Sequence, residues 1–296
     1  MKALISGIKR MEIHDGDGLR TTVFLKGCSL KCIWCHNPEG IGFSKQVAHF
    51  EQKCVGCGGC AAVCPEKAIT MPEGKPVIDR DKCVGCFSCV AACPTEAMHG
   101  YGNEWHIDDL EEFLLQDELF WRHSGGGVTF SGGECMMQPQ FVTELSKRLH
   151  ARGISVDIDT CGQVRREVLT RIIPYVDTFL YDVKAVDPEV HKLCTGYTNE
   201  QIISNLRYLS ESGCRIEVRY PLVKGYNDME CHKIGQLLKD MPGIVKIKVL
   251  KYHHFAGSRY EALGMENTLP DTETTTEDVL NAVEILKSYG LNAAND

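Results

Sequence analysis

The chain has 296 residues, and its 32 Lys and Arg against 40 Asp and Glu give a formal net charge of -8 at pH 7. This length can bury a sizeable core without disulfide staples, and the acidic balance offers no basic field for the phosphates of nucleic acids. The sequence also shows no secretory signal at its start and no apolar run near the roughly 20 residues of a membrane helix. We therefore expect a soluble cytoplasmic monomer that binds neither nucleic acid nor membrane.

Strand and helix patterns alternate along the chain. Short strands rich in β-branched or aromatic residues are predicted at 20–26, 127–131, 154–159, 177–183, 215–221 and 244–250. Apolar residues at helical spacing predict helices at 108–123, 138–152, 164–173, 199–212, 229–240 and 275–289. The alternation indicates an α/β fold with a parallel sheet, either doubly wound or curled into a barrel that falls short of eight units. In both architectures the ligand site lies at the carboxyl ends of the strands.

The most unusual feature of the composition is its 16 cysteines. Eleven of them fall between Cys28 and Cys93, grouped two or three residues apart, and the other five are scattered singly. Disulfides are rare in the cytoplasm, so this crowding indicates metal ligation.

Residues 49–100 differ from the rest of the chain and contain an internal repeat. Each half matches C-x2-C-x2-C-x3-C-P, the bacterial ferredoxin run in which the fourth cysteine ligates the other cluster. The crossed pattern assigns one 4Fe-4S cluster to Cys54, Cys57, Cys60 and Cys93, and a second to Cys83, Cys86, Cys89 and Cys64. We expect residues 49–100 to be a ferredoxin-like insert between residues 1–48 and 101–296. Its clusters have no open iron, which favours electron relay over catalysis.

The first predicted strand is followed by a different cysteine motif. Cys28, Cys32 and Cys35 form a C-x3-C-x2-C triplet, which can hold only three irons of a 4Fe-4S cluster and leaves the fourth open. A zinc site with His36 as the fourth ligand is the alternative interpretation.

This triplet resembles the signature of the radical S-adenosylmethionine (radical SAM) enzymes, whose open iron binds S-adenosylmethionine (SAM). The second predicted strand ends in Ser131-Gly132-Gly133-Glu134, similar to the family's G-G-E-P motif, which receives the methionyl ammonium. Two glycines allow close backbone approach and a carboxylate complements a positive group. By the same resemblance, Trp34 lies beside the adenine, although an ordinary core aromatic is an equal alternative.

Further motifs narrow the resemblance to the glycyl radical enzyme activating enzymes. The motifs are Asp15-Gly16-Asp17-Gly18-Leu19-Arg20, Cys35-His36-Asn37-Pro38-Glu39, Asp159-Thr160-Cys161-Gly162, Asp182-Val183-Lys184 and Arg219-Tyr220. The departures from the family pattern are Asp17 for proline, Cys135 for proline and Cys161 for asparagine. The resemblance implies a partial (β/α)6, TIM-like open barrel carrying the ferredoxin-like insert.

The resemblance also implies roles for single residues. Asn37, Glu134, Asp159, Lys184 and His253 would surround SAM, with Lys184 facing its carboxylate and His253 its ribose or adenine. Arg219 would belong to the same shell. Asp159, Thr160 and Asp182 would hold a monovalent cation.

The resemblance therefore implies an enzyme with three 4Fe-4S clusters and a protein substrate. It would cleave SAM reductively to a 5′-deoxyadenosyl radical and remove a Cα hydrogen from a glycine of a partner glycyl radical enzyme, with flavodoxin or ferredoxin as electron donor. The alternatives are a radical SAM maturase or small-molecule radical enzyme with auxiliary clusters, and a ferredoxin-type electron carrier. The carrier hypothesis leaves Glu134, Asp159, Lys184 and His253 unexplained.

Overall fold

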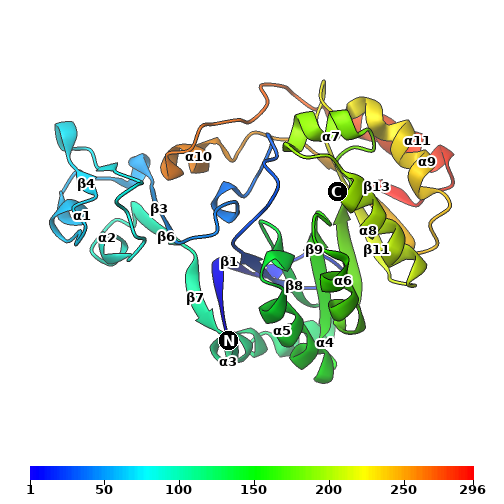
Figure 1. Ribbon diagram of the computed structural model, residues 1–296, viewed down its shortest axis with the longest axis horizontal. Helices are drawn as coiled ribbons and strands as arrows, with labels where there is room; N and C mark the ends of the chain where they lie inside the picture. Colours follow the sequence, from blue (N-terminus) through cyan, green and yellow to red (C-terminus); the bar gives the residue numbers. More distant parts are fainter.

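A nine-stranded sheet forms the centre of the computed structural model, which describes residues 1–296 (Figure 1). Its order is β13-β12-β11-β10-β9-β8-β2-β1-β7, so β13 and β7 are free edges and the sheet stays open. Seven strands are parallel: β2 (Arg20–Leu25), β8 (Gly127–Gly132), β9 (Ser155–Thr160), β10 (Thr178–Asp182), β11 (Ile216–Leu222), β12 (Ile244–Lys251) and β13 (Ala293–Asn295). The six predicted strands are confirmed, and each end agrees to within one residue.

Two strands that the sequence analysis did not predict extend the sheet beyond β2. These are β1 (Lys2–Glu12) and β7 (Asn103–His106), both antiparallel to their neighbours. β2, the first parallel strand, is therefore the second strand of an antiparallel hairpin with β1. β1 and β7 lie at the open side of the sheet.

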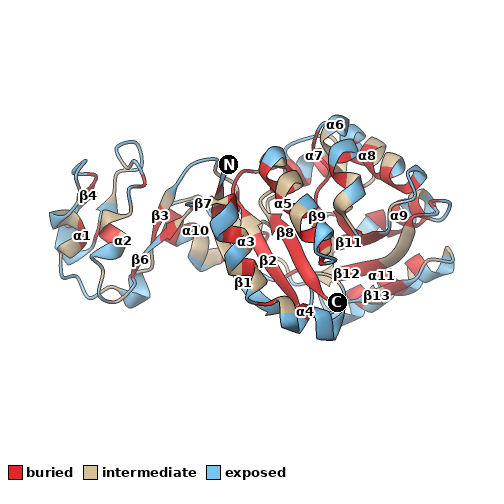
Figure 2. Ribbon diagram, turned by 90° about the horizontal axis from the view of Figure 1, so that it is seen from below, coloured by how far each residue is buried: buried red, intermediate tan, exposed pale blue.

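Helices cover the outer face of the sheet (Figures 1 and 2). Five follow the predicted periodicity: α5 (Pro139–Ala151), α6 (Arg166–Ile172), α8 (Glu200–Glu211), α9 (Cys231–Leu238) and α11 (Thr276–Ser288). The single helix predicted over 108–123 is wrong, because the chain forms α3 (Ile107–Leu115) and α4 (Glu118–Ser124). Asp117 between them is buried and accepts hydrogen bonds from Arg10 Nε and Thr21 Oγ1. Two more helices, α7 (Pro188–Thr195) and α10 (Gly257–Leu263), lie in loops after β10 and β12. None of the helices is long and apolar enough to span a bilayer.

Side chains alternate between the two faces of the parallel strands, as β9 illustrates. Val156 and Ile158 are completely buried in the apolar core, which also contains Leu145 and Leu149 of α5. The intervening Asp157 and Asp159 point to the opposite face, because successive side chains of a strand alternate. The interior of the curled sheet is therefore polar.

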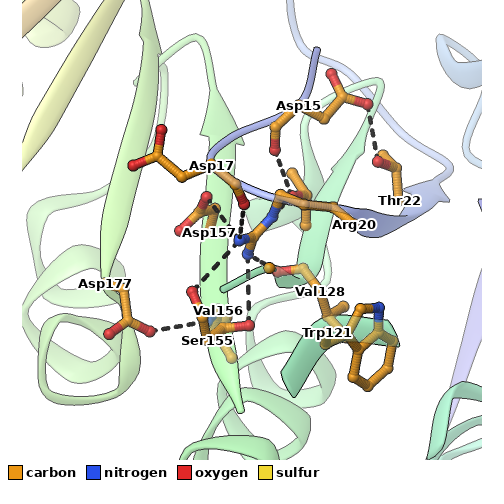
Figure 3. Close-up of polar contacts among 12 residues, drawn as sticks. Asp15, Asp17, Arg20, Thr22, Trp121, Val128, Ser155, Val156, Asp157 and Asp177 are labelled. Carbon is orange, nitrogen blue, oxygen red and sulfur yellow. Dashed lines mark hydrogen bonds and ion pairs between the residues drawn. The ribbon is translucent and has the colours of Figure 1, made fainter. Parts of the chain in front are cut away.

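A loop from the β1–β2 hairpin, residues 13–19, crosses the amino ends of the strands (Figure 3). The main-chain carbonyl of His14 accepts hydrogen bonds from Arg219 Nη2 at 2.8 Å and Lys248 Nζ at 3.2 Å. Arg215 pairs with Asp17 at 2.9 Å. These contacts tie the loop to β11 and β12 across the interior, so the amino end is covered.

Residues 46–101, here called the lobe, extend away from the sheet (Figures 1 and 2). Its two ends pair as antiparallel strands β3 (Gln46–His49) and β6 (Met98–Tyr101). Between them lie α1 (Gly59–Ala62), α2 (Ser88–Ala91) and the short pair β4 (Ile69–Thr70) and β5 (Val77–Ile78). The lobe has its own small core of Val47, Cys60, Ile69, Cys89 and Met98.

Single turns of 3-10 helix complete the fold. They span Pro38–Gly40, Glu51–Lys53, Pro72–Gly74, Cys135–Met137, Ile173–Tyr175 and Asp228–Glu230.

Candidate active site

One cavity of about 610 Å³ opens at the carboxyl ends of the parallel strands. All seven parallel strands contribute to it, as expected for a sheet whose loops at this end carry the chemistry. Its lining contains Cys28, Cys32, Trp34, Cys35, Asn37, Gly132, Gly133, Asp159, Thr160, Asp182, Lys184, Arg219 and His253. The structure thus gathers all but one of the residues predicted to surround SAM.

The cysteine loop, residues 28–39, has no regular structure before its terminal 3-10 turn at Pro38. Hydrogen bonds of 2.9 Å from the amides of Lys31 and Ile33 to the end of α7 hold one side of it. Its three thiols face the cavity without converging tightly enough for a single metal ion, and a cubane cluster does not require that, since each thiolate binds a different iron.

Burial and the charge of Lys184 act in opposite directions on the thiols of the cysteine loop. Burial raises the pKa of the Cys32 thiol to about 12, and the Lys184 ammonium opposes that rise. The thiolate form that ligates iron therefore depends on positive charge in the cavity.

Gly132 and Gly133 bring the β8 loop against the cysteine loop. Gly132 has a φ of +122°, and a Cβ there would lie 2.1 Å from the carbonyl oxygen of Leu25. A Cβ on Gly133 would lie 2.4 Å from the carbonyl oxygen of Gly40. Only glycine fits this approach, which leaves the backbone of both residues on the cavity wall.

Glu134 differs from the expectation that its side chain binds SAM. It is completely buried and does not line the cavity. Its carboxylate accepts hydrogen bonds from Thr160 Oγ1 at 2.8 and 2.9 Å, from the amide of Cys161 at 2.9 Å and from the amide of Met136 at 3.1 Å. The geometry gives Glu134 the role of joining the β8 loop to the β9 loop, because three donors from the two loops share its buried carboxylate.

Asp159 and Arg219 form the floor of the cavity. Asp159 Oδ2 accepts a hydrogen bond from Ser131 Oγ at 2.6 Å and lies 3.6 Å from Arg219 Nη1, which is also 3.4 Å from Asp15. Burial raises the pKa of Asp159 to about 7, against the opposing effect of the Arg219 charge. A positive group placed beside Asp159 would favour its ionised form.

Lys184 is a second buried cation of the cavity and follows β10, the strand between β9 and β11. Its Nζ lies 2.5 Å from Asp182 Oδ2, and only 8% of the residue is exposed. Burial works against the charge of the ammonium, but Asp182 and the thiols of Cys32 and Cys161 outweigh it and raise the pKa of Lys184. Lys184 therefore carries a fixed positive charge suited to a carboxylate.

Aromatic rings border the cavity on the β12 side. His253 lies between His36, with ring centroids 4.1 Å apart, and Phe255, at 4.6 Å, and both pairs are stacked. Trp34 is 5% exposed and packs with Cys194 and Tyr252 while also lining the cavity. Its position beside the adenine therefore stays a prediction, next to that of an ordinary core aromatic.

Two small cavities lie within the lobe, and four cysteines line each of them. One is lined by Cys64, Cys83, Cys86 and Cys89, and the other by Cys54, Cys57, Cys60 and Cys93. These are the two crossed sets expected from the repeat. Four thiols around each cavity are the donor set of a fully ligated 4Fe-4S cluster.

Residues 22–238 match the family model described as the radical SAM superfamily. The chain belongs to the radical SAM superfamily. It is 39% identical over 291 residues to the trans-4-hydroxy-L-proline dehydratase activating enzyme of Clostridioides difficile, which covers 97% of this chain and 96% of the relative. It is also 39% identical to the choline trimethylamine-lyase activating enzyme of Oleidesulfovibrio alaskensis, over 96% of this chain and 94% of that one.

Within the radical SAM superfamily, the chain belongs to the glycyl radical enzyme activating enzymes. Among solved structures, Streptococcus suis SuiB bound to precursor peptide SuiA aligns with a TM-score of 0.53 and 15% identity, covering 91% of this chain and 46% of that one. At this identity the likeness shows the radical SAM fold alone.

Several residues that line this radical SAM cavity had no role in the sequence analysis. They include Lys9, Glu12, Asp15, Cys161 and Tyr252. Asp15 and Cys161 lie within the family motifs of the sequence analysis, so these motifs could have predicted that both residues line the cavity. Lys9 and Glu12 belong to β1, which no sequence pattern predicted to border the site.

Proposed function

We propose that this radical SAM activating enzyme uses three 4Fe-4S clusters, with Cys28, Cys32 and Cys35 holding the one that binds SAM. When bound, that cluster supplies the electron that cleaves SAM to the 5′-deoxyadenosyl radical, which takes a Cα hydrogen from a glycine of a partner glycyl radical enzyme. One observation carries the proposal: a single cavity is lined by three thiols, two close-packed glycines and charged side chains of both signs.

The charged residues of the cavity would orient SAM. Asp159 and the backbone of Gly132 and Gly133 would receive the methionyl ammonium, and Lys184 would face the carboxylate. A carboxylate on β9 and an ammonium after the adjacent β10 would favour one orientation of the zwitterionic methionyl group. Arg219 holds Asp159 in place at 3.6 Å.

The other end of SAM would lie against the aromatic wall. The stacked His36 and His253 rings, with Trp34 and Asn37, offer flat apolar surfaces and polar edges for adenine and ribose. Glu134 would act indirectly by holding the β8 and β9 loops together.

The monovalent cation remains part of the proposal, with Asp159 and Asp182 as its carboxylate ligands. The hydroxyl of Thr160 donates to Glu134 and accepts from the Gly162 amide, so one lone pair of its oxygen would be left to contribute. Asp182 would exchange its present contact with Lys184 for one shared with the cation.

The lobe would hold two auxiliary clusters, one for each crossed set of four cysteines around its two cavities. Complete thiolate ligation leaves no site for a substrate, so these clusters would relay electrons from flavodoxin or ferredoxin. Residues 46–101 would then function as the ferredoxin-like domain of the enzyme.

The deciding experiment incubates the reconstituted enzyme anaerobically with SAM, a reductant and a glycyl radical enzyme encoded in a neighbouring reading frame. We expect 5′-deoxyadenosine and an electron paramagnetic resonance (EPR) signal of a backbone radical on the partner in equal amounts. A partner whose radical-bearing glycine is replaced by alanine is the control. Formation of 5′-deoxyadenosine without a partner radical, accompanied by consumption of a small molecule or a precursor peptide, would favour the alternative radical SAM functions.

A further inference from the structure

We propose that Arg259 and Tyr260 of α10 are positioning residues that set the conformation of the cysteine loop and couple it to the lobe. The inference rests on the proposed function, because it assumes that the loop holds a SAM-binding cluster. It concerns residues 252–270 of the segment that joins β12 to α11, which we call the bridge.

The bridge contacts the cysteine loop along its length. The Tyr260 hydroxyl donates to the carbonyl of Cys35 at 3.1 Å, and Thr268 Oγ1 donates to the carbonyl of Ile33 at 3.1 Å. Arg259 Nη1 lies 2.9 Å from Glu39 Oε1 and 3.4 Å from Asn37 Oδ1. The His36 ring contacts the carbonyl of His253 at 2.8 Å and stacks on its ring.

The same bridge packs against the lobe. Ala262 and Leu263 of α10 form a small apolar cluster with Ala48 of β3. Arg80 of the lobe donates from Nη2 to the carbonyl of Ala262 at 3.2 Å and from Nη1 to the carbonyl of Val47. Figure 1 shows α10 between the lobe and the sheet. The lobe and the cysteine loop thus share one support.

The cysteine loop depends on such outside contacts because it makes few of its own. It has no helix or strand between Cys28 and Cys35, so its main-chain carbonyls must find partners elsewhere. α7 holds one side through the amides of Lys31 and Ile33, and the bridge holds the other. Tyr260 is only 1% exposed, so its hydroxyl is a fixed donor. A shift of α10 would therefore move the main chain that carries Cys35.

The first test replaces Tyr260 with Phe, which removes the hydroxyl and keeps the ring. We expect iron content to stay as in the wild type, while the SAM dissociation constant rises about two- to tenfold, the effect of one lost hydrogen bond. The difference spectrum, which is the EPR spectrum with SAM minus the spectrum without SAM, should also change. It reports on the SAM-binding cluster, because only that cluster responds to SAM. Arg259→Lys should act in the same direction. A difference spectrum and affinity equal to those of the wild type would overturn the positioning role, and so would loss of iron from the cluster.

The second test addresses the coupling and uses Arg80, which touches α10 but not the cavity. Arg80→Ala, and the milder Arg80→Lys, should alter the same difference spectrum with total iron unchanged. Lys75→Ala is the matched control, because Lys75 lies in the lobe and pairs only with the exposed Glu51. An Arg80 variant that retains its iron but shows the wild-type difference spectrum would overturn the coupling. Failure of the proposed function would show separately, as a wild-type protein whose spectrum does not respond to SAM.

Discussion

Arg20 Nη1 lies 3.3 Å from Asp157 Oδ2 inside the amino end of the sheet, and the two side chains are 1% and 3% exposed (Figure 3). Arg20 also donates to Thr129 Oγ1 and to the carbonyl of Val128, whereas Asp157 Oδ1 accepts no hydrogen bond. The pair joins β2 to β9 below the cavity. Burial raises the pKa of Asp157 to about 7, against the opposing effect of Arg20.

Replacing Arg20 with Leu should therefore destabilise the protein by about 3–5 kcal/mol, because a buried carboxylate loses its partner. A carboxyl group whose pKa is raised on folding stabilises the protein at low pH and loses that contribution as pH rises toward the folded pKa. In wild type the loss should level off above the Asp157 pKa of about 7. In the variant that pKa climbs further, so stability should keep falling.

Thermal unfolding of the anaerobic protein on both sides of neutral pH checks this prediction. The control is Arg20→Leu in an Asp157→Asn background, because position 157 then has no carboxyl group to titrate. Equal destabilisation of Arg20→Leu at both pH values would contradict the argument.

Reconstituted protein should hold about twelve irons, from three clusters of four. Replacing Cys28, Cys32 and Cys35 with Ala should remove about four irons and all SAM cleavage, because the lobe keeps its own ligands. Iron and sulfide analysis, together with 5′-deoxyadenosine assays, measures both effects. Cys214 lies outside all three cysteine-lined cavities. Cys214→Ser should therefore change neither the iron content nor SAM cleavage. SAM cleavage by the triple variant would refute the assignment of the SAM-binding cluster.

Lys184 and Glu134 should respond differently to substitution with Ala. Loss of Lys184 removes one charge-assisted contact of roughly 1.5–3 kcal/mol, so SAM affinity should fall about tenfold to a hundredfold with iron retained. Loss of Glu134 leaves the buried Thr160 hydroxyl and the Cys161 amide without acceptors, so it should also lower the thermal midpoint.

Titration calorimetry and thermal unfolding separate these two effects. Lys287→Ala, at an exposed ion pair, is the neutral control. If Glu134→Ala weakened SAM binding without any loss of stability, its buried hydrogen bonds would not be the source of its effect.

Replacing Cys54, Cys57 and Cys60 with Ala should impair turnover supported by flavodoxin or ferredoxin more than turnover supported by dithionite. A small chemical reductant can reach the SAM-binding cluster directly, whereas a relay is needed only by a protein donor. Parallel assays with both reductants, with the first cluster verified by spectroscopy, measure the difference. Equal impairment would contradict electron relay and point to a role of the lobe in docking the partner enzyme.

Local sequence patterns were sufficient for six of the seven parallel strands, and the short β13 was not predicted. Each of the six predicted strands lies within one residue of its observed ends, because runs of β-branched and aromatic residues between helical segments leave little choice of structure. The cavity residues were predictable for a related reason. Motifs such as Gly132-Gly133 and Asp182-Val183-Lys184 follow these strands directly, and the carboxyl ends of parallel strands meet at one edge.

The tertiary structure decided which groups are free to bind. The sequence places Glu134 at the site, but only the packed loops show that Thr160 and Cys161 already occupy its carboxylate. The bridge is similar, because its contacts with the cysteine loop join residues more than 200 positions apart and no local pattern marks them. Periodicity and motifs report the preferences of neighbouring residues, whereas hydrogen-bond partners are chosen by the packing of distant segments.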